Sequence, residues 1–277
     1  MSLFQPFDPG DENGRRRLRP LPQVPIRSVL PSLVTLVALC AGLTAIRMAV
    51  ELRFEMAILL IVIAAALDGI DGRIARFLKS TSRFGAELDS IADFVNFGVA
   101  PVIVLYVWTL RDLRSLGWIS VLVFAICAAL RLARFNVTLD APNKPDWHAA
   151  YFVGVPAPAG ALLVMLPLYI EFVAVPHGVL TAPVVLVYTI AIGLLMVSRF
   201  PTWSGKLIGR RISRDLVAPL FVCGVLVVAL LASFPWATMS VIALAYLAGL
   251  PVTWNAYHRR QREIVKAAEA DAGKPEA

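Results

Sequence analysis

The fold is decided by the stretch Asp68-Gly-Ile-Asp71-Gly72-Arg-Ile-Ala75-Arg76, which is followed at a fixed distance by Gly85-Ala-Glu-Leu-Asp89-Ser-Ile-Ala-Asp93. Four aspartates lie here within a chain that is otherwise strongly apolar. A carboxylate in or beside a bilayer is costly, so an ionisable side chain in such a place indicates a functional site. Four carboxylates together need a shared partner, and a bound cation is the simplest one.

The aspartates form two pairs whose spacing predicts a helical hairpin. Asp68 and Asp71 are related as i,i+3 and therefore share one helix face. Asp89 and Asp93 are related as i,i+4 and share a face as well. A turn near residues 80–81 places Asp71 level with Asp89, roughly 14 Å from the turn. It places Asp68 level with Asp93, roughly 19 Å from the turn, so that all four carboxylates meet in one cavity.

Oxygen ligands alone favour a hard cation, so Mg²⁺, Mn²⁺ or Ca²⁺ is expected in preference to Zn²⁺. Gly72 and Gly85 each cost about 1 kcal/mol relative to alanine inside a helix, which predicts a ligand or a close helix beside them. Arg76 could hold a phosphate as a charged fork. The alternative is a structural salt-bridge cluster with Arg73 and Arg76, but two arginines cannot neutralise four carboxylates.

The pattern D-x₂-D-G-x₂-A-R-x₈-G-x₃-D-x₃-D resembles the signature of the CDP-alcohol phosphotransferases. The matching positions are Asp68, Asp71, Gly72, Ala75, Arg76, Gly85, Asp89 and Asp93. The resemblance implies that a phosphatidyl group is transferred from CDP-diacylglycerol to an alcohol and that CMP is released. It also implies one or two divalent ions, Mg²⁺ or Mn²⁺, bound by the four aspartates.

The resemblance further implies roles for single residues. Asp93 is the expected catalytic base, and the expected nucleotide- and diphosphate-binding residues are Gly72, Ala75, Arg76, Gly85 and Thr35. Ser32 and Ala38 stand at positions where the family usually has asparagine.

Four further stretches, at 93–101, 129–136, 152–158 and 197–201, resemble the phosphatidylserine synthase branch of the family. This likeness implies L-serine as the acceptor. Glycerol 3-phosphate, inositol phosphate or choline could serve the same aspartates.

Three residues near the end of one apolar segment are candidates for binding the acceptor. Arg131 and Arg134 are related as i,i+3, and either could bind a phosphate or the acceptor's carboxylate. Asn136 could contact the acceptor's amine. The alternative for the two arginines is anchoring at the cytoplasmic membrane surface.

The composition predicts an all-α polytopic membrane protein, because 58% of the 277 residues are hydrophobic and the mean hydropathy is +0.74. Apolar segments of spanning length are expected at about 30–50, 54–78, 84–109, 115–136, 150–172, 180–199, 214–233 and 237–257. Gly154, Pro156 and Pro158 are expected to kink or locally open the fifth segment. The net charge of +7 does not indicate nucleic-acid binding, because most of the basic residues lie in loops on one side.

The distribution of basic residues predicts that both termini are cytoplasmic, which requires an even number of spans such as eight. The aspartate cavity would then open to the cytosol, at the inner membrane of a bacterium. Residues 1–27 form a basic, disordered arm, residues 28–257 the transmembrane domain, and residues 258–277 a cytoplasmic tail.

Two predictions concern assembly and an unrelated function. Small residues on many spans suit a homodimer of packed helices, in line with the family resemblance. A cation-coupled transporter could also use buried carboxylates. It is disfavoured, because transporters usually have internal repeats and a site at the midplane, whereas here no repeat is evident and the carboxylates lie toward one side.

Overall fold

The computed structural model describes residues 26–77, 82–139, 151–173, 181–198, 201–203 and 214–272. Every one of the eight predicted apolar segments contains helix. The elements in chain order are α1 (Ile26–Val50), α2 (Phe54–Phe77), α3 (Arg83–Asp93), the π-helical turn η1 (Phe94–Val99), α4 (Ala100–Trp108), the short 3₁₀ turn η2 (Leu110–Leu113), α5 (Ser115–Leu139), β1 (Tyr151–Val153), α6 (Ala157–Val164), α7 (Leu166–Val173), α8 (Thr181–Val197), β2 (Pro201–Trp203), α9 (Arg214–Ser233) and α10 (Pro235–Ala272).

Four helical stretches are long and apolar enough to cross a membrane. They are Leu30–Val50, Arg83–Trp108, Ser115–Val137 and Pro235–Trp254. Ala157–Val173, Ala182–Val197 and Ala218–Ser233 are apolar but shorter. This confirms a helical protein of the membrane type, whereas the number of eight spans and the cytoplasmic position of the termini remain predictions.

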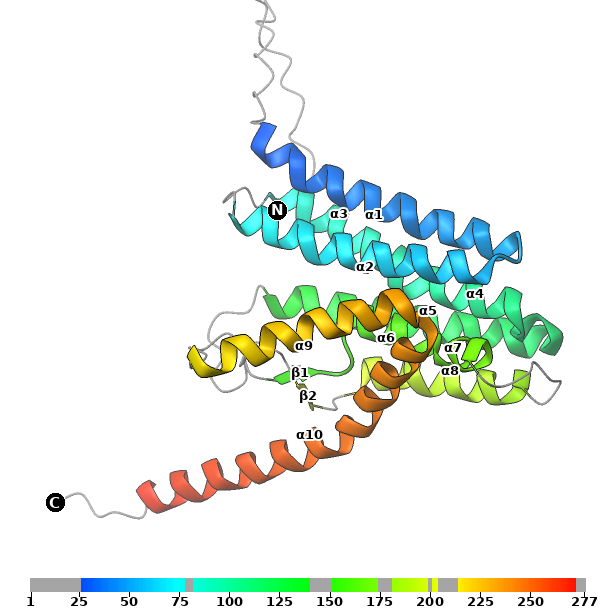
Figure 1. Cartoon of the computed structure of the whole chain (residues 1–277). Coiled ribbons are helices and arrows are strands. Elements are labelled where there is room, and N and C mark those ends of the chain that lie inside the picture. The colour runs from blue at the N-terminus through cyan, green and yellow to red at the C-terminus, as the bar shows by residue number, and fades with distance from the viewer. Residues whose placement is uncertain are drawn as a thin grey trace, which may run out of the picture.

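The first three helices form one side of the bundle (Figure 1). α1 packs along α2, and α3, η1 and α4 continue one another and pack against α1. α5 packs against η1 and α8, and α6 lies between η1 and α8. α10 packs on α7, α9 and β2, and its C-terminal part leaves the bundle (Figure 1).

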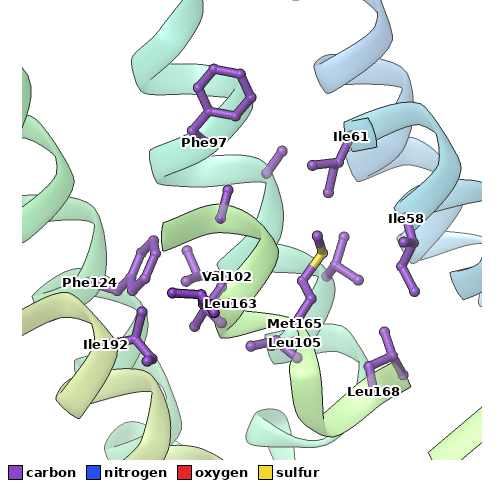
Figure 2. Packing of buried hydrophobic residues seen from close by; sticks show 14 of the residues in the cluster. Ile58, Ile61, Phe97, Val102, Leu105, Phe124, Leu163, Met165, Leu168 and Ile192 are labelled. Carbon is purple, nitrogen blue, oxygen red and sulfur yellow. The ribbon is translucent and has the colours of Figure 1, made fainter. Parts of the chain in front are cut away.

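The core is built where these helices meet (Figure 2). Ile61 of α2, Phe97 of η1, Phe124 of α5, Leu163 of α6 and Ile192 of α8 are all buried in one cluster. Lipid tails are as apolar as these side chains, so close packing rather than escape from water holds such helices together.

The π-helical turn directly follows Asp93 and brings Asn96 against α1. Asn96 is 1% exposed, and its side-chain oxygen has no hydrogen-bond partner within the described part of the chain. A Cβ atom added to Gly42 would lie 2.0 Å from that oxygen. Only glycine therefore lets α1 approach η1 so closely, and its Cα–H group faces the amide oxygen, a contact typical of close helix pairs.

The fifth apolar segment is locally open at Gly154 and Pro156, which is one of the two alternatives that the sequence predicted. The backbone is not helical there, and α6 begins only at Ala157. Gly154 has a left-handed φ of +79°, which ends β1, and Pro158 sits in the first helical turn, where its missing N–H costs nothing. The helix is broken further along, at Met165 between α6 and α7.

Two other features were not predicted from the sequence. β1 pairs antiparallel with β2, with Phe152 opposite Thr202, and forms a two-stranded sheet in a chain predicted to be wholly helical. α10 continues to Ala272, past the predicted end of the last span at 257.

Replacement of Gly42 by alanine is expected to destabilise the fold by about 1–3 kcal/mol, because the added methyl group would overlap Asn96. The measurement is thermal unfolding of the purified protein in detergent. Gly224→Ala is the matched control, since nothing lies within 4 Å of the corresponding Cβ position on α9. Equal melting temperatures for the two variants would contradict the close approach of α1 and η1.

Candidate active site

The structure brings the four aspartates together, as the spacing predicted. Asp68 and Asp71 lie on α2, and Asp89 and Asp93 lie on α3. Carboxylate oxygens of Asp68, Asp71 and Asp89 all lie within 4.8 Å of one another. The side chain of Asp68 is also in hydrogen-bonding contact with those of Asp89 and Asp93. The predicted turn at residues 80–81 lies outside the described residues.

α1 supplies a contact that fixes one of these carboxylates. The Thr35 hydroxyl donates a hydrogen bond to Oδ2 of Asp71 at 2.6 Å and lies 3.1 Å from the carbonyl oxygen of Pro31. Thr35 is 5% exposed and Asp71 is 4% exposed. Thr35, which was expected to bind the nucleotide, thus directs its hydroxyl to Asp71.

The aspartates have no basic counterpart among the side chains that the structure describes. In this set no arginine or lysine nitrogen lies within 4.0 Å of their carboxylates, and Arg73 is exposed. The backbone of Ala75 and Arg76 belongs to α2, but their side chains lie outside the described set. Carboxylates that approach one another without a counter-charge repel, so the group of three could hold a metal ion.

The two glycines of the motif have different surroundings. A Cβ at Gly72 would meet nothing within 4 Å, so this face of α2 is open, as expected for the approach of a ligand. A Cβ at Gly85 would lie 3.1 Å from the Ser82 hydroxyl oxygen. Ser82 caps α3 by accepting a hydrogen bond from the Gly85 N–H at 3.0 Å, so the missing side chain at Gly85 leaves room for the helix cap.

The three candidate acceptor residues of α5 point in different directions. Asn136 donates from Nδ2 to the hydroxyl of Ser90, the residue that follows Asp89 in α3, at 2.9 Å. Arg131 is buried and donates from Nε to the carbonyl oxygen of Val155 at 3.3 Å. Arg134 is exposed and donates from Nη1 to the carbonyl oxygen of Val197 at 2.7 Å.

It follows that Asn136 joins the aspartate-bearing helix, whereas Arg134 is turned to the end of α8. Sequence reasoning missed two serines of this region. Ser82 caps α3, and the hydroxyl of Ser90 accepts the hydrogen bond from Asn136. The signal for Ser82 was present, because serine directly before a helix is a preferred N-cap residue. Ser90 offered only its position next to Asp89.

Comparison with known proteins assigns most of the chain. Residues 28–196 match the family model described as CDP-alcohol phosphatidyltransferase. Residues 215–251 match a second model, described as CDP-alcohol phosphatidyltransferase 2. The first match contains the four aspartates and the α5 residues, and the second contains parts of α9 and α10.

Several curated proteins are similar over most of the chain. A CDP-diacylglycerol–serine O-phosphatidyltransferase of Mycobacterium leprae is 41% identical over 245 residues, which is 83% of this chain and 77% of the relative. The protein of the same name from Mycobacterium tuberculosis H37Rv is 39% identical over 261 residues, 88% of each chain. One from Helicobacter pylori 26695 is 36% identical over 177 residues, 63% of this chain and 73% of the relative.

Addition of Mn²⁺ is expected to raise the melting temperature of the wild-type protein and to have little effect on Asp89→Asn. A ligand at 100 times its dissociation constant stabilises the folded state by about 2.7 kcal/mol. Without Mn²⁺ the variant is expected to be at least as stable as wild type, because one repelling charge has been removed.

The control is Asp112→Asn, since Asp112 is exposed in η2 and belongs to no carboxylate group that could hold a metal among the described residues. Its response to Mn²⁺ is expected to equal that of wild type. Equal responses in Asp89→Asn and wild type would exclude the aspartate group as the metal site.

Proposed function

The chain belongs to the CDP-alcohol phosphatidyltransferase family, and we propose that it transfers the phosphatidyl group of CDP-diacylglycerol to L-serine, giving phosphatidylserine and CMP. The observation that carries the proposal is the convergence of Asp68, Asp71 and Asp89 at the meeting point of α1, α2 and α3. The names of the curated relatives support serine as the acceptor.

The aspartates would hold one or two divalent cations, Mg²⁺ or Mn²⁺. Three close carboxylates offer the oxygen donors that these ions prefer, and α1 fixes the orientation of Asp71 through Thr35. When bound, the metal would supply positive charge that stabilises the negative charge developing on the diphosphate. Ca²⁺ could occupy the same oxygen ligands.

In the transfer step the serine hydroxyl oxygen forms a bond to the phosphorus that carries the diacylglycerol. The bond from that phosphorus to the oxygen of CMP breaks, and CMP leaves. The hydroxyl proton passes to a carboxylate oxygen of Asp93, the catalytic base. In support of this role, Asp93 contacts Asp68 but is outside the group of three carboxylates, so it is available for a proton.

The donor would lie on the open side of α2. Gly72 leaves space there for the nucleotide and diphosphate, and Ala75 and Arg76 follow on the next helical turn. Gly85 keeps the start of α3 free of a side chain beside Ser82. Thr35 would act on the donor through Asp71, which its hydroxyl holds.

The acceptor would lie between α3 and α5. Asn136 is hydrogen-bonded to Ser90, the residue after Asp89, and would contact the amine of serine. Arg131 and Arg134 would supply positive charge on the same helix. The alternative acceptors, glycerol 3-phosphate, inositol phosphate and choline, would use the same aspartates and differ at these α5 residues.

We also propose that the chain crosses the inner membrane of a bacterium eight times, with both termini and the aspartates on the cytoplasmic side. Residues 28–257 form the transmembrane domain, between the N-terminal arm at 1–27 and the tail at 258–277. The excess of lysine and arginine in the loops on the side of the termini supports this orientation.

The protein is further proposed to work as a homodimer. Gly69 on α2 and Gly249 on α10 have no neighbouring atom within 4 Å of their Cβ positions. Small residues on exposed helix faces allow the helices of two chains to approach closely in a membrane.

Purified protein in detergent is expected to release CMP from CDP-diacylglycerol when Mn²⁺ and L-serine are both present. Asp93→Asn is expected to lower kcat by about 10²–10⁴-fold, the usual contribution of a positioned general base. The measurement is CMP formation, with phosphatidylserine identified by mass spectrometry.

The assay is repeated with glycerol 3-phosphate, inositol phosphate and choline, and Asp112→Asn serves as the control variant. Turnover with one of these acceptors and not with serine would support phosphatidyl transfer but would show that serine is not the acceptor. Absence of CMP release with every acceptor would overturn the transferase and favour cation transport.

The orientation is tested by cysteine labelling in a variant without Cys40, Cys127 and Cys223. A membrane-impermeant maleimide is expected to label Arg83→Cys only in inside-out vesicles, because Arg83 starts α3 at the proposed cytoplasmic end. Asp112→Cys, beyond the other end of the same helical stretch, is expected to react only from the outside. The reverse pattern would invert the topology.

A further inference from the structure

Arg131 is a buried cation without an acidic partner in the described part of the structure. It is 6% exposed, its Nε donates to the carbonyl oxygen of Val155, and its guanidinium lies 5.5 Å from the centre of the Phe135 ring. A guanidinium has five N–H donors, and only the one at Nε has a hydrogen-bond acceptor among the described residues. A buried charge is costly unless it is paired, so the remaining donors point to an oxyanion ligand.

The beginning of α6 presents further donors at the same place. Ala157 and Ala159 are in the first turn of α6, and their N–H groups have no acceptor among the described residues. Ala157 is 5% exposed, so its N–H is withdrawn from solvent. Helix N-termini attract anions through such groups. Arg131 is bonded to Val155, two residues before Ala157, so the guanidinium and the helix N-terminus are adjacent.

A third group comes from α10. The Tyr246 side chain lies close enough to the Arg131 guanidinium to interact with it electrostatically. Tyr246 is half-buried against the core, and α10 packs on β2 beside the start of α6. Its hydroxyl can donate a hydrogen bond to an anion held by Arg131.

This place is level with the proposed base. The Asn136–Ser90 hydrogen bond sets the register between α5 and α3. α5 packs against η1, which continues α3, and it runs in the opposite direction. Counted from that bond into the bundle, Arg131 lies five residues along α5 and Asp93 lies three residues along α3. At 1.5 Å per residue the two differ in depth by about 3 Å. Neighbouring helices are about 8–10 Å apart, so a small amino acid between them can face both residues.

We propose that Arg131, the N-terminus of α6 and Tyr246 form an oxyanion subsite that binds the carboxylate of the amino acid acceptor. The inference rests on the proposed transfer to serine and adds to it the residues that recognise the acceptor. A single carboxylate matches one guanidinium with neutral donors around it, whereas the diphosphate of the donor belongs beside the aspartates and their metal. The subsite therefore selects serine over amino alcohols that lack the carboxylate.

The test compares Tyr246→Phe and Arg131→Gln with wild type in the CMP-release assay. Both variants are expected to raise the KM for serine, Tyr246→Phe by about tenfold, because a hydrogen bond to a charged ligand is lost. The KM for CDP-diacylglycerol is expected to stay unchanged. Tyr188→Phe is the matched control, because its hydroxyl donates to the carbonyl oxygen of Leu163 in α6, away from the subsite.

Selectivity supplies a readout that a purely structural role would not change. The ratio of kcat/KM for serine to kcat/KM for ethanolamine is expected to be high in wild type and to fall at least tenfold in Arg131→Gln. Arg131→Lys is expected to restore part of the ratio, since it keeps the charge and loses the fork. If Arg131→Gln does not fold, Tyr246→Phe alone decides.

The outcomes separate this proposal from the one on which it rests. An unchanged serine KM in Tyr246→Phe with an unchanged ratio in Arg131→Gln would overturn the subsite and leave the serine transfer intact. If the variants raise the KM for CDP-diacylglycerol instead of that for serine, the subsite binds the diphosphate of the donor. That result would also overturn the proposed carboxylate subsite. Failure of the wild-type protein itself to use serine would overturn the proposed function and, with it, the carboxylate assignment.

Discussion

The mutual repulsion of carboxylates on two helices is the constraint that governs this part of the molecule. At the 4.8 Å limit that bounds the group of three, two unit charges repel by about 3 kcal/mol in a medium of effective dielectric constant 20. Such an arrangement is stable in a membrane protein only when a positive charge enters it. The hydrogen bond from Thr35 holds the carboxylate of Asp71 in a position to bind a cation. The open face at Gly72 leaves room for the nucleotide substrate.

The site is divided between two groups of helices that a polar contact joins. α1, α2 and α3 carry the aspartates, whereas α5, α6 and α10 surround Arg131. The bond between Asn136 and Ser90 connects the two groups next to Asp89. The relative position of donor and acceptor therefore depends on packing between whole helices, and on the close approach of α1 to η1 that Gly42 permits.

The sequence was sufficient for features that depend on neighbours along the chain. Apolar length predicted the helical segments, and the i,i+3 and i,i+4 pairs predicted that Asp68 meets Asp93 and that Asp71 meets Asp89. Features that depend on contacts between residues far apart in the chain could not be predicted from the sequence. The pairing of β1 with β2 joins remote segments, and helices that are apolar all round give no sign of which face turns inward, so the burial of Arg131 and the direction of Arg134 came only from the fold.

The arrangement of the site depends on the number of residues in the π-helical turn η1, which lies between Asp93 and α4. A π-helical turn contains one residue more than an α-helical turn at the same place. Loss of a single residue from Phe94–Val99 would restore regular helix and rotate α3 relative to α4 by about 100°. Asp89 and Asp93 on α3 would then turn away from Asp68 and Asp71 on α2, while α4 kept its place in the core. Insertions and deletions within this segment would therefore be selected against, because they would separate the two pairs of aspartates.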